Sequence, residues 1–403
     1  MSELSYLEKL MDGVEVEWKA VGDIAGYSTT KVDADKLDAT SFVGVDNLLA
    51  DKGGRIDATY QPNTARLTAY EPGDILLGNI RPYLKKVWMA ENNGGCSGDV
   101  LAIRILADCK KIISPEYLYY ALSSDSFFSY SMQHAKGAKM PRGSKDAILN
   151  YQIPIPCPSA PEKSLAIQSE IVRILDKFTA LTAELTAELT MRKKQYNYYR
   201  DQLLSFKDGE VEWKTLGEVA QYSKTRISFE LLDERNYVGV DNLLQNRAGK
   251  SLSNHVPTSG KLTEFIPNDI LIGNIRPYLK KIWQADCIGG TNGDVLVIRC
   301  IDSSINTRYL YQILADDKFF EYNMQHAKGA KMPRGSKEDI MKYPIPVPPL
   351  TLQARIVEIL NKFDTLTNSI TEGLPREIEL RQKQYEYYRD LLFSFPKPET
   401  ASN

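Results

Sequence analysis

The strongest constraint on the fold is that this chain contains most of its sequence twice. The segment Val16–Lys19 recurs as Val211–Lys214, and the string MQHAKGAKMPRGSK begins at Met132 and again, unchanged, at Met324. Each copy covers nearly half of the 403 residues, far more than one repeat of a solenoid protein. The pattern predicts a duplicated globular domain with a trailing helix, in the order domain, helix, domain, helix.

Each globular part mixes apolar, β-rich runs with short helical stretches, which predicts the α+β class. In the first copy, residues 74–77 and 99–103 are expected strands and residues 115–122 an expected helix. Proline-spaced runs, IPIPCP from Ile153 and YPIPVPP from Tyr343, are expected to be extended linkers, because proline lacks an N–H and fixes φ. The expected boundaries are 1–155 (with a short N-terminal segment, 1–13) and 209–347 for the two domains, and 156–208 and 348–403 for the helices.

Two long amphipathic helices are predicted, the first over residues 162–206, because apolar residues recur at three- and four-residue steps. Two like stripes in one duplicated chain favour an antiparallel coiled coil with pseudo-twofold symmetry, although each helix could instead pack on its own domain. Gly373-Leu374-Pro375 should break or kink only the second helix. The residues expected at the helix pair are Ile171, Ile174, Phe178, Leu181, Leu185, Ile356, Ile359, Phe363, Leu366 and Ile370.

Composition points to a soluble cytoplasmic protein without a disulfide framework. No run approaches eighteen apolar residues, and the N-terminus lacks the basic and apolar regions of a signal peptide. The five cysteines form no C-x-x-C pair, which argues against a thiolate metal site. The formal net charge is −2, so any surface that binds nucleic acid must be a local cluster of cations.

The sequence offers little material for catalysis. Only three histidines are present, and no phosphate-binding loop, nucleophile elbow or H-E-x-x-H string occurs. Glu17-Trp18-Lys19 and its copy at Glu212 resemble the tail of a metal-dependent nuclease site, but no acidic partner is evident. A tryptophan that packs at the domain entrance is the favoured interpretation.

Two basic segments, each present twice, favour DNA binding. The first holds four cations and no acidic residue, and its glycines allow close approach to phosphate oxygens. The second, GNIRPYLKK, adds side chains that can bond base edges or stack, although a strand-end turn with a buried tyrosine is an alternative. The candidate residues are Lys136, Lys139, Arg142, Lys145, Asn79, Arg81, Tyr83, Lys85 and Lys86, and in the second copy Lys328, Lys331, Arg334, Lys337, Asn274, Arg276, Tyr278, Lys280 and Lys281.

The copies differ most in residues 29–40 and 50–65, against 224–235 and 245–260. Loops that vary on a shared scaffold are where binding specificity can reside. We therefore expect these segments to distinguish the two recognition surfaces.

Together these motifs resemble the specificity subunit of type I restriction-modification enzymes over essentially the whole chain. The N-terminal SYLEKLMDGVEVEW and the helix endings KKQYNYYRD and QKQYEYYRD carry this resemblance, and Thr182–Leu185 and Thr186–Leu189 are similar to the Thr-Ala-Glu-Leu units of the IC subfamily. The resemblance implies two target-recognition domains that read the halves of a split double-stranded DNA site, with the helices as a ruler between them.

The resemblance also implies that the chain itself is non-catalytic and binds no cofactor or metal. Two methyltransferase (modification) subunits would bring S-adenosylmethionine for adenine methylation, and restriction (translocase) subunits would use ATP and Mg²⁺. The helix endings at residues 193–200 and 381–389 could dock the modification subunits, or they could be solvated faces. Family members commonly carry dissimilar recognition domains, whereas these are close copies, which predicts two similar half-sites. A standalone DNA-binding or architectural protein is the alternative.

Overall fold

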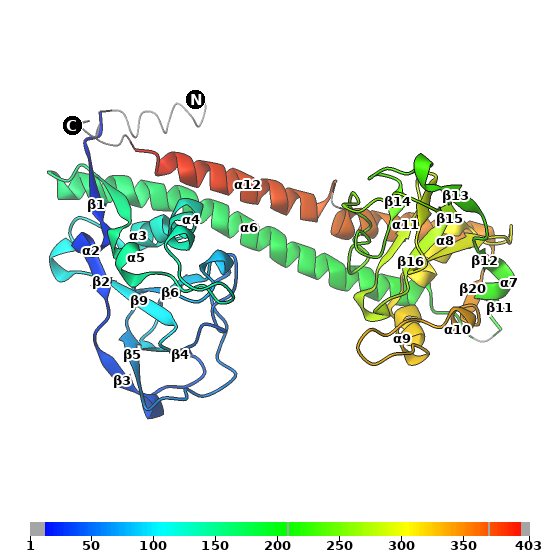
Figure 1. The fold of residues 1–403 in the computed structure, drawn as a ribbon, viewed down its shortest axis with the longest axis horizontal. Coiled ribbons are helices and arrows are strands. Elements are labelled where there is room, and N and C mark those ends of the chain that lie inside the picture. Colours follow the sequence, from blue (N-terminus) through cyan, green and yellow to red (C-terminus); the bar gives the residue numbers. More distant parts are fainter. Residues whose placement is uncertain (1–12, 208, 370, 396–403) are drawn as a thin grey trace. The chain divides into compact units, whose positions relative to one another are not determined.

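The computed structural model describes residues 13–207, 209–369 and 371–395 (Figure 1). The chain divides into two compact units. Unit 1 comprises Met1–Leu181 together with Gln382–Asn403, and unit 2 comprises Thr182–Arg381. Unit 1 therefore includes a segment from the far end of the chain, whereas unit 2 is continuous in sequence.

Unit 1 is built from short strands and helices, as the α+β class requires. The predicted helix over 115–122 is confirmed, because Ser114 caps its first turn and Pro115 takes its first position. The strands are β1 (Val16–Ala20), β2 (Ala25–Tyr27), β3 (Lys31–Asp33), β4 (Phe42–Val43), β5 (Arg66–Tyr70), β6 (Ile75–Gly78), β7 (Val87–Met89), β8 (Gly94–Cys96), β9 (Val100–Ile105) and β10 (Gln152–Pro156). The helices are α2 (Val21–Ile24), α3 (Pro115–Leu122), α4 (Asp125–Gln133) and α5 (Lys145–Asn150), with 3₁₀ turns η1 (Ala34–Lys36), η2 (Pro82–Leu84) and η3 (Ala107–Cys109).

Two four-stranded sheets organise unit 1. One has the order β2-β9-β6-β7 and is antiparallel throughout. The other has the order β3-β5-β8-β4, in which only β4 and β8 run parallel. The runs predicted as strands over 74–77 and 99–103 fall on β6 and β9, neighbours in the first sheet.

The proline-spaced run that was expected to be a linker is a strand. It forms β10, which pairs antiparallel with β1 and sets Trp18 opposite Pro154. Proline lacks an N–H, but in a two-stranded sheet one edge of each strand needs no partner. The second run behaves in the same way, with Trp213 opposite Pro346. The extended conformation was predicted correctly, and the interpretation as a free linker was wrong.

Unit 2 repeats this architecture element by element. Its two four-stranded sheets have the orders β12-β19-β16-β17 and β13-β15-β18-β14. The strands are β11 (Glu212–Thr215), β12 (Ala220–Tyr222), β13 (Arg226–Ser228), β14 (Tyr237–Val238), β15 (Lys261–Phe265), β16 (Ile270–Gly273), β17 (Ile282–Gln284), β18 (Gly289–Thr291), β19 (Val295–Cys300) and β20 (Pro344–Val347). The helices are α7 (Leu216–Val219), α8 (Thr307–Leu314), α9 (Asp317–Gln325) and α10 (Lys337–Ile340), with 3₁₀ turns η4 (Phe229–Leu231) and η5 (Pro277–Leu279).

Three long helices complete the fold: α6 (Pro161–Leu203), α11 (Leu350–Asn368) and α12 (Leu374–Leu392). The break predicted in the second helix is confirmed between α11 and α12. Gly373 has φ of 80°, and a Cβ there would lie 2.4 Å from the Thr365 carbonyl oxygen, so the break depends on glycine. None of the described helices combines the length and apolarity that a membrane span requires.

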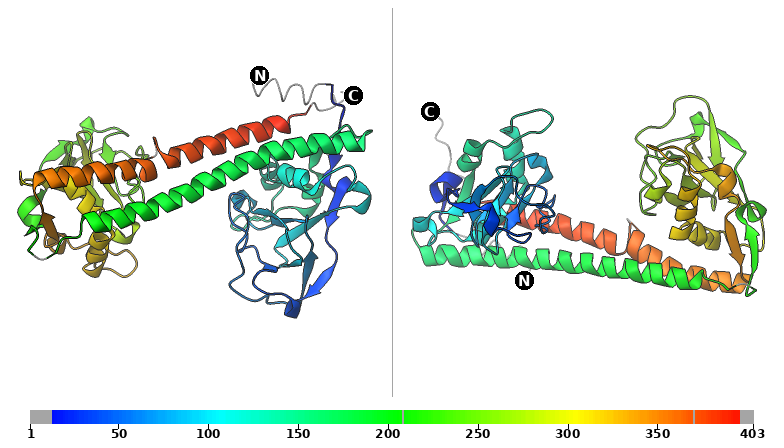
Figure 2. Two further views of the ribbon diagram at one scale, coloured as in Figure 1. Left: turned by 180° about the vertical axis from the view of Figure 1, so that it is seen from behind. Right: turned by 90° about the horizontal axis from the view of Figure 1, so that it is seen from below.

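The predicted helix pair is confirmed inside each unit. In unit 1 the beginning of α6 lies beside the end of α12 (Figure 2). Phe178 of α6 stacks there on Tyr388 of α12, with ring centres 5.3 Å apart. In unit 2 the end of α6 lies beside α11, where Tyr196 stacks on Phe363 at 5.8 Å. Pairing of beginning with end is the pattern of antiparallel helices.

The other residues expected at the helix pair have different environments. Ile171 and Ile356 are buried in the cores of their units, Ile174 packs on the first core, and Leu181, Leu185, Ile359 and Leu366 are partly exposed. Ile370 lies outside the described residues. Each helix pair is thus also part of a domain core, so both alternatives left by the sequence hold together.

Candidate nucleic-acid interface

The two basic segments meet in one surface on unit 1. The chain leaves β6 at Gly78, and the Arg81 N–H donates to the Pro141 carbonyl at 2.7 Å. The Gly143 N–H donates to the Asn79 carbonyl at 3.0 Å, and Ile80 and Arg142 form a β-bridge. These contacts join segments about 60 positions apart in the sequence, which the sequence alone did not place together.

Unit 2 makes the same junction with nearly the same geometry. The Arg276 N–H donates to the Pro333 carbonyl at 2.7 Å, and the Gly335 N–H donates to the Asn274 carbonyl at 3.1 Å. Ile275 and Arg334 form the corresponding bridge. The duplication has therefore kept a surface, as well as two sequence motifs.

A strained turn presents the aromatic side chain. Arg81 and Lys85, at the two ends of η2, both have left-handed backbone conformations, with φ of 53° and 50°. Pro82 is buried beneath the turn, and Tyr83 is 49% exposed. Tyr278 in unit 2 is equally exposed, so the alternative of a buried tyrosine is not what the structure shows. An exposed aromatic ring beside an exposed arginine can stack on a base or bond a phosphate.

The first basic segment forms a small hairpin. The main chains of Lys136 and Arg142 hydrogen-bond in both directions, at 2.9 and 2.8 Å. Gly137, with φ of 100°, allows the turn. The cations on and just after the hairpin are all exposed: Lys136, Lys139, Arg142, Lys145, and in unit 2 Lys328, Lys331, Arg334 and Lys337.

One cation in each hairpin already has an acidic partner. Arg142 pairs with Asp99 at 2.7 Å, and Arg334 pairs with Asp294 at 3.0 Å. Both arginines remain more than half exposed. Surface pairs of this kind contribute little and can be exchanged for a phosphate.

The lysines that close GNIRPYLKK face inward. Lys85 pairs with Asp125 at 2.7 Å, and the Lys86 ammonium donates to the Val45 carbonyl at 2.7 Å. In unit 2, Lys280 pairs with Asp317 at 2.7 Å, and Lys281 donates to the Val240 carbonyl at 2.5 Å. These four residues were predicted to bind DNA. In the structure their ammonium groups instead bond residues of their own unit and hold the turn in place.

Asn79 and Asn274 are buried, at 8% and 6% exposed, so their side chains have no open path to a base edge. Their main chains hold the hairpin, as described above. Their side-chain oxygens lie close to Gly143 and Gly335, where a Cβ would come within 2.8 Å. The geometry gives them a structural part in the surface.

Two arginines reach this region from the helix endings, which were predicted from the sequence to dock partner subunits or to be solvated faces. Arg389 of α12 is fully buried in unit 1, and its Nη2 lies 3.1 Å from the Asp125 carboxylate. Arg200 of α6 is 2% exposed in unit 2. The available signal was that both helix endings read Tyr-Tyr-Arg-Asp.

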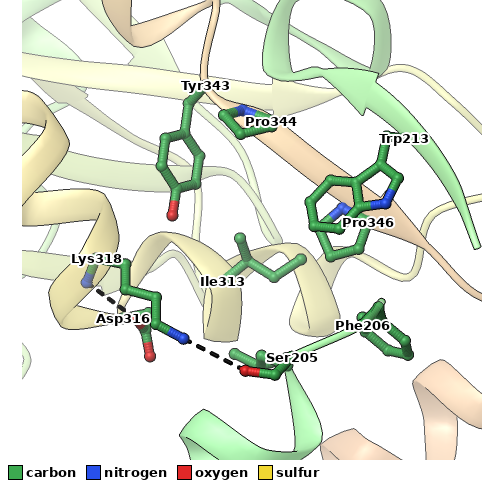
Figure 3. A pocket seen from close by; sticks show the side chains of 10 residues that line it. Ser205, Phe206, Trp213, Ile313, Asp316, Lys318, Tyr343, Pro344 and Pro346 are labelled. Carbon is green, nitrogen blue, oxygen red and sulfur yellow. Dashed lines mark hydrogen bonds between the residues drawn. The ribbon is translucent and has the colours of Figure 1, made fainter. Parts of the chain in front are cut away.

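A separate apolar groove occurs in each unit near the paired strands β11–β20 and β1–β10. In unit 2 its volume is about 320 Å³, and Trp213, Tyr343 and Phe206 line it (Figure 3). The groove of unit 1, about 610 Å³, includes Trp18, Tyr151 and Phe395. Trp18 packs on the core of unit 1, as expected, whereas Trp213 is 43% exposed in the groove of unit 2.

The lysines of the Glu-Trp-Lys strings that resembled a nuclease site form ion pairs in both units. Lys19 pairs with Glu17 at 3.1 Å, and Lys214 pairs with Asp302 at 2.8 Å. Over residues 13–207, 209–369 and 371–395, no group of three or more His, Cys, Asp or Glu side chains could hold a metal. The five cysteines are free thiols, as expected.

Comparison with known proteins identifies relatives of the whole chain. The family model described as type I restriction modification DNA specificity domain matches residues 72–191 and 209–380. The chain is 42% identical, over its whole length and that of the relative, to the EcoR124I/EcoR124II type I restriction enzyme specificity subunit of Escherichia coli.

Two solved structures share the fold. The type I restriction-modification S subunit from M. genitalium superposes with a TM-score of 0.55 at 14% identity, covering 96% of this chain and 98% of that one. A chain from a study of complex assembly and conformational transition of the type I R-M system gives 0.54 at 19% identity, covering 94% and 97%.

Proposed function

Because this chain belongs to the type I restriction-modification DNA specificity family, we propose that each of its units reads one half of a split DNA site through the turn and hairpin described above. The chain is the DNA-specificity subunit of such a system. The observation that carries the proposal is the junction of the two basic segments, made by the same main-chain bonds in both units.

The side chains divide between two tasks. Hairpin cations such as Lys139 and Lys331 suit phosphate oxygens, which fix position without reading sequence. Arg81 and Tyr83, with Arg276 and Tyr278, stand exposed on rigid turns and suit base edges. Because the two units present the same residues on the same backbone, we propose that the two half-sites are similar in sequence.

The catalytic steps belong, in this proposal, to partner subunits in the cytoplasm. Two modification subunits would bind S-adenosylmethionine and methylate adenine, and restriction subunits would use ATP and Mg²⁺. A relative with a solved structure was studied in the assembly of a type I R-M system, which supports a complex of this kind. A standalone architectural protein would instead purify without a methyltransferase.

Spacing between half-sites would depend on α6. Its two Thr-Ala-Glu-Leu units, residues 182–189, lie within a continuous helix in which the Thr186 hydroxyl bonds the Thr182 carbonyl at 2.8 Å. One unit adds about 6 Å of helix, against about 3.4 Å per base pair. Deleting residues 186–189 is therefore expected to shorten the gap by one or two base pairs, as in a ruler.

Methylome sequencing of cells that express the complete system tests the proposal. The expected result is one interrupted motif with two similar halves, and unrelated halves would refute the similarity. Tyr83→Ala should weaken the base preference at positions of one half-site only, and Tyr278→Ala should do so in the other half-site. Lys362→Ala, on the exposed face of α11 where Lys362 pairs with Glu358, is the matched surface control and should leave the motif unchanged.

Affinity against salt separates the two tasks. Lys139→Ala should weaken binding to all sequences about equally and lower the slope of log K against log salt by about 1, as expected for one lost phosphate contact. Tyr83→Ala should leave that slope in place. If both variants change sequence preference and neither changes the slope, the division of tasks is incorrect.

A further inference from the structure

A single carboxylate in unit 1 gathers three cations from three parts of the chain. Asp125, the first residue of α4, lies 2.7 Å from Lys85, 3.1 Å from Lys52 and 3.1 Å from Arg389. Lys85 ends the turn that presents Tyr83, and Lys52 lies in the variable segment 50–65. Burial opposes the charge on Asp125, but the hydrogen bonds from Lys85 and Lys52 outweigh it and keep its pKa below the ordinary value.

The main chain ties the same two loops together. The Asp51 N–H donates to the Leu84 carbonyl at 2.9 Å, and the Lys52 N–H donates to the Lys85 carbonyl at 3.0 Å. Asp51, Lys52 and Lys85 all have positive φ, a conformation that is unfavourable for residues with a Cβ. Such a backbone persists only when its surroundings hold it. Among these surroundings, the ion cluster around Asp125 connects the two loops to α12.

Arg389 links this cluster to α12. Its side chain is fully buried, and the guanidinium also lies over the Tyr385 ring, 5.6 Å from its centre. A buried guanidinium needs anionic or hydrogen-bonding partners, and here these are Asp390, next to it in the sequence, at 3.0 Å and the Asp125 carboxylate beside the turn at 3.1 Å. The docked position of the helix end and the shape of the turn therefore depend on the same ion cluster.

Unit 2 has the same arrangement with one link exchanged. Lys280 pairs with Asp317 at 2.7 Å, and Arg247, at the position of Lys52, also pairs with Asp317. Arg247 in addition donates to the Ala315 carbonyl, to which Arg200 donates at 3.4 Å. The helix arginine of unit 2 thus acts on the carboxylate only indirectly, through a shared carbonyl group.

We infer that Arg389 and Arg200 are positioning residues for DNA recognition, each holding the turn of its own unit in the shape that reads a half-site. The helices, in addition to spacing the half-sites, then help to shape the surface that reads them. This inference rests on the proposed function and deepens it. Neither arginine contacts DNA, because both are buried.

The test uses the full chain in complex with its modification subunits. Arg389→Met and Arg200→Met each remove a helix arginine, and Arg192→Met is the matched control, because Arg192 lies on α6 in a partly exposed pair with Glu188. For each half-site, the measurement is the ratio of affinities for the cognate duplex and for duplexes altered at one base, taken well below the melting temperature. Arg389→Met should lower discrimination at one half-site about tenfold, the size of one lost base contact.

Arg200→Met should lower discrimination at the other half-site by less than tenfold, because its link to Asp317 is indirect. Arg192→Met should change neither. Arg389→Lys, which keeps a cation, should recover part of the loss. Asp125→Asn should affect the same half-site as Arg389→Met, and the double variant should be no worse than Asp125→Asn alone, because that substitution already breaks the link to Arg389.

Two outcomes overturn the inference. In one, Arg389→Met lowers the melting temperature but leaves discrimination unchanged at both half-sites, so that the arginine is merely structural. In the other, both half-sites weaken equally. If Arg389→Met fails to assemble, Lys52→Met breaks the same cluster from the loop side and carries the test. A wild-type complex that recognises no interrupted sequence would instead overturn the proposed function.

Discussion

The two units of this duplicated chain keep the same backbone but connect one carboxylate differently. In unit 1, Asp125 binds a lysine from the variable loop and the arginine of the helix. In unit 2, the loop contributes Arg247, whose guanidinium bonds both the Asp317 carboxylate and the Ala315 carbonyl. Arg200 of the helix bonds that carbonyl and not the carboxylate. The comparison teaches that the duplication preserved the reading turn more strictly than the ion pairs beneath it.

The long helices differ in a second way. In the first copy Tyr196 follows Gln168 by 28 positions (196 − 168). In the second copy the equivalent residue Tyr385 follows Gln353 by 32 positions (385 − 353). Both glutamines bond the domain in the same manner, Gln168 to the Ile112 carbonyl and Gln353 to the Ser304 carbonyl. The four extra residues coincide with the break between α11 and α12. In a continuous helix these four residues would lengthen the helix, whereas here they lie in the break between α11 and α12.

The largest expected effect follows from where each unit obtains its helix ending. A stop after Arg381 removes Arg389, Leu392 and Phe395 from unit 1, whereas the equivalent residues of unit 2 are internal to the chain. Each fully buried apolar side chain contributes about 1.5–3 kcal/mol, against a total stability of about 5–15 kcal/mol. Unit 1 should unfold and unit 2 should persist.

Limited proteolysis followed by mass spectrometry of the fragments measures this asymmetry. Cleavage should concentrate in residues of unit 1, and a stop after Phe395, which keeps the core residues, is the control. Equal resistance of the two units in the Arg381 truncation would show that unit 1 does not depend on α12.

Removing the shared carboxylate should destabilise unit 1 more than unit 2. Asp125→Ala leaves three cations without their common partner, and Asp317→Ala leaves two. Breaking a fully buried pair costs about 3–5 kcal/mol. Because Asp125 and Asp317 are 32% and 42% exposed, solvent screening lowers the expected loss to about 2–3 and about 1–2 kcal/mol. Urea unfolding that resolves the two units gives both values.

The pH dependence of unfolding checks the electrostatic origin of that loss. The pKa of Asp125 is lowered in the folded protein, so its contribution is present above the unfolded pKa and is lost as pH falls through the folded pKa. The stability difference between wild type and Asp125→Asn should be constant above about pH 5 and shrink below about pH 4. A difference that stays constant down to pH 3 would point to packing instead of charge.

The contrast between the helices can be tested at the break. Gly373→Ala places a Cβ 2.4 Å from the Thr365 carbonyl oxygen at a positive φ, and should cost about 2 kcal/mol. Gly209→Ala, with φ of 86° but nothing within 4 Å, carries only the backbone strain and should cost about 1 kcal/mol. Thermal unfolding compares the two variants, and equal losses would mean that the break can relax around a side chain.

Sequence reasoning was most successful where information is local or repeated. The duplication predicted the order of the elements, the spacing of apolar residues predicted α6, and the helix expected over residues 115–122 is α3. It could not predict that Arg81 would meet Pro141, because main-chain bonds between distant loops leave no trace in side-chain type. Proline-rich strands were interpreted as linkers because pairing along one edge is invisible in a single strand.

The candidate site shows the same limit. Basic residue type predicted Lys85 and Lys139 equally, yet one pairs inward with Asp125 and the other is exposed. Lys85 faces inward because it ends the turn η2 and bonds Asp125, an acidic residue 40 positions later in the sequence. The preserved Asp of α4 and α9, within the strings SDSFF and DDKFF, which differ at two of their five positions, was the available signal for that partner.

The smallest effect tests the exchanged link directly. Arg247→Lys gives unit 2 the residue type of unit 1, removing the hydrogen bond to the Ala315 carbonyl and costing about 1 kcal/mol. A lysine cannot span the carbonyl and the carboxylate together, so Arg200 should then move toward Asp317 and couple to it. A double-mutant cycle between Arg200→Met and Asp317→Asn measures this coupling, which should be small in wild type, where the link is indirect, and larger by about 0.5 kcal/mol or more in the Arg247→Lys background. Unchanged coupling would mean that the backbone of unit 2 determines its ion pairs. The loop residue would then not decide which arginine the Asp317 carboxylate binds.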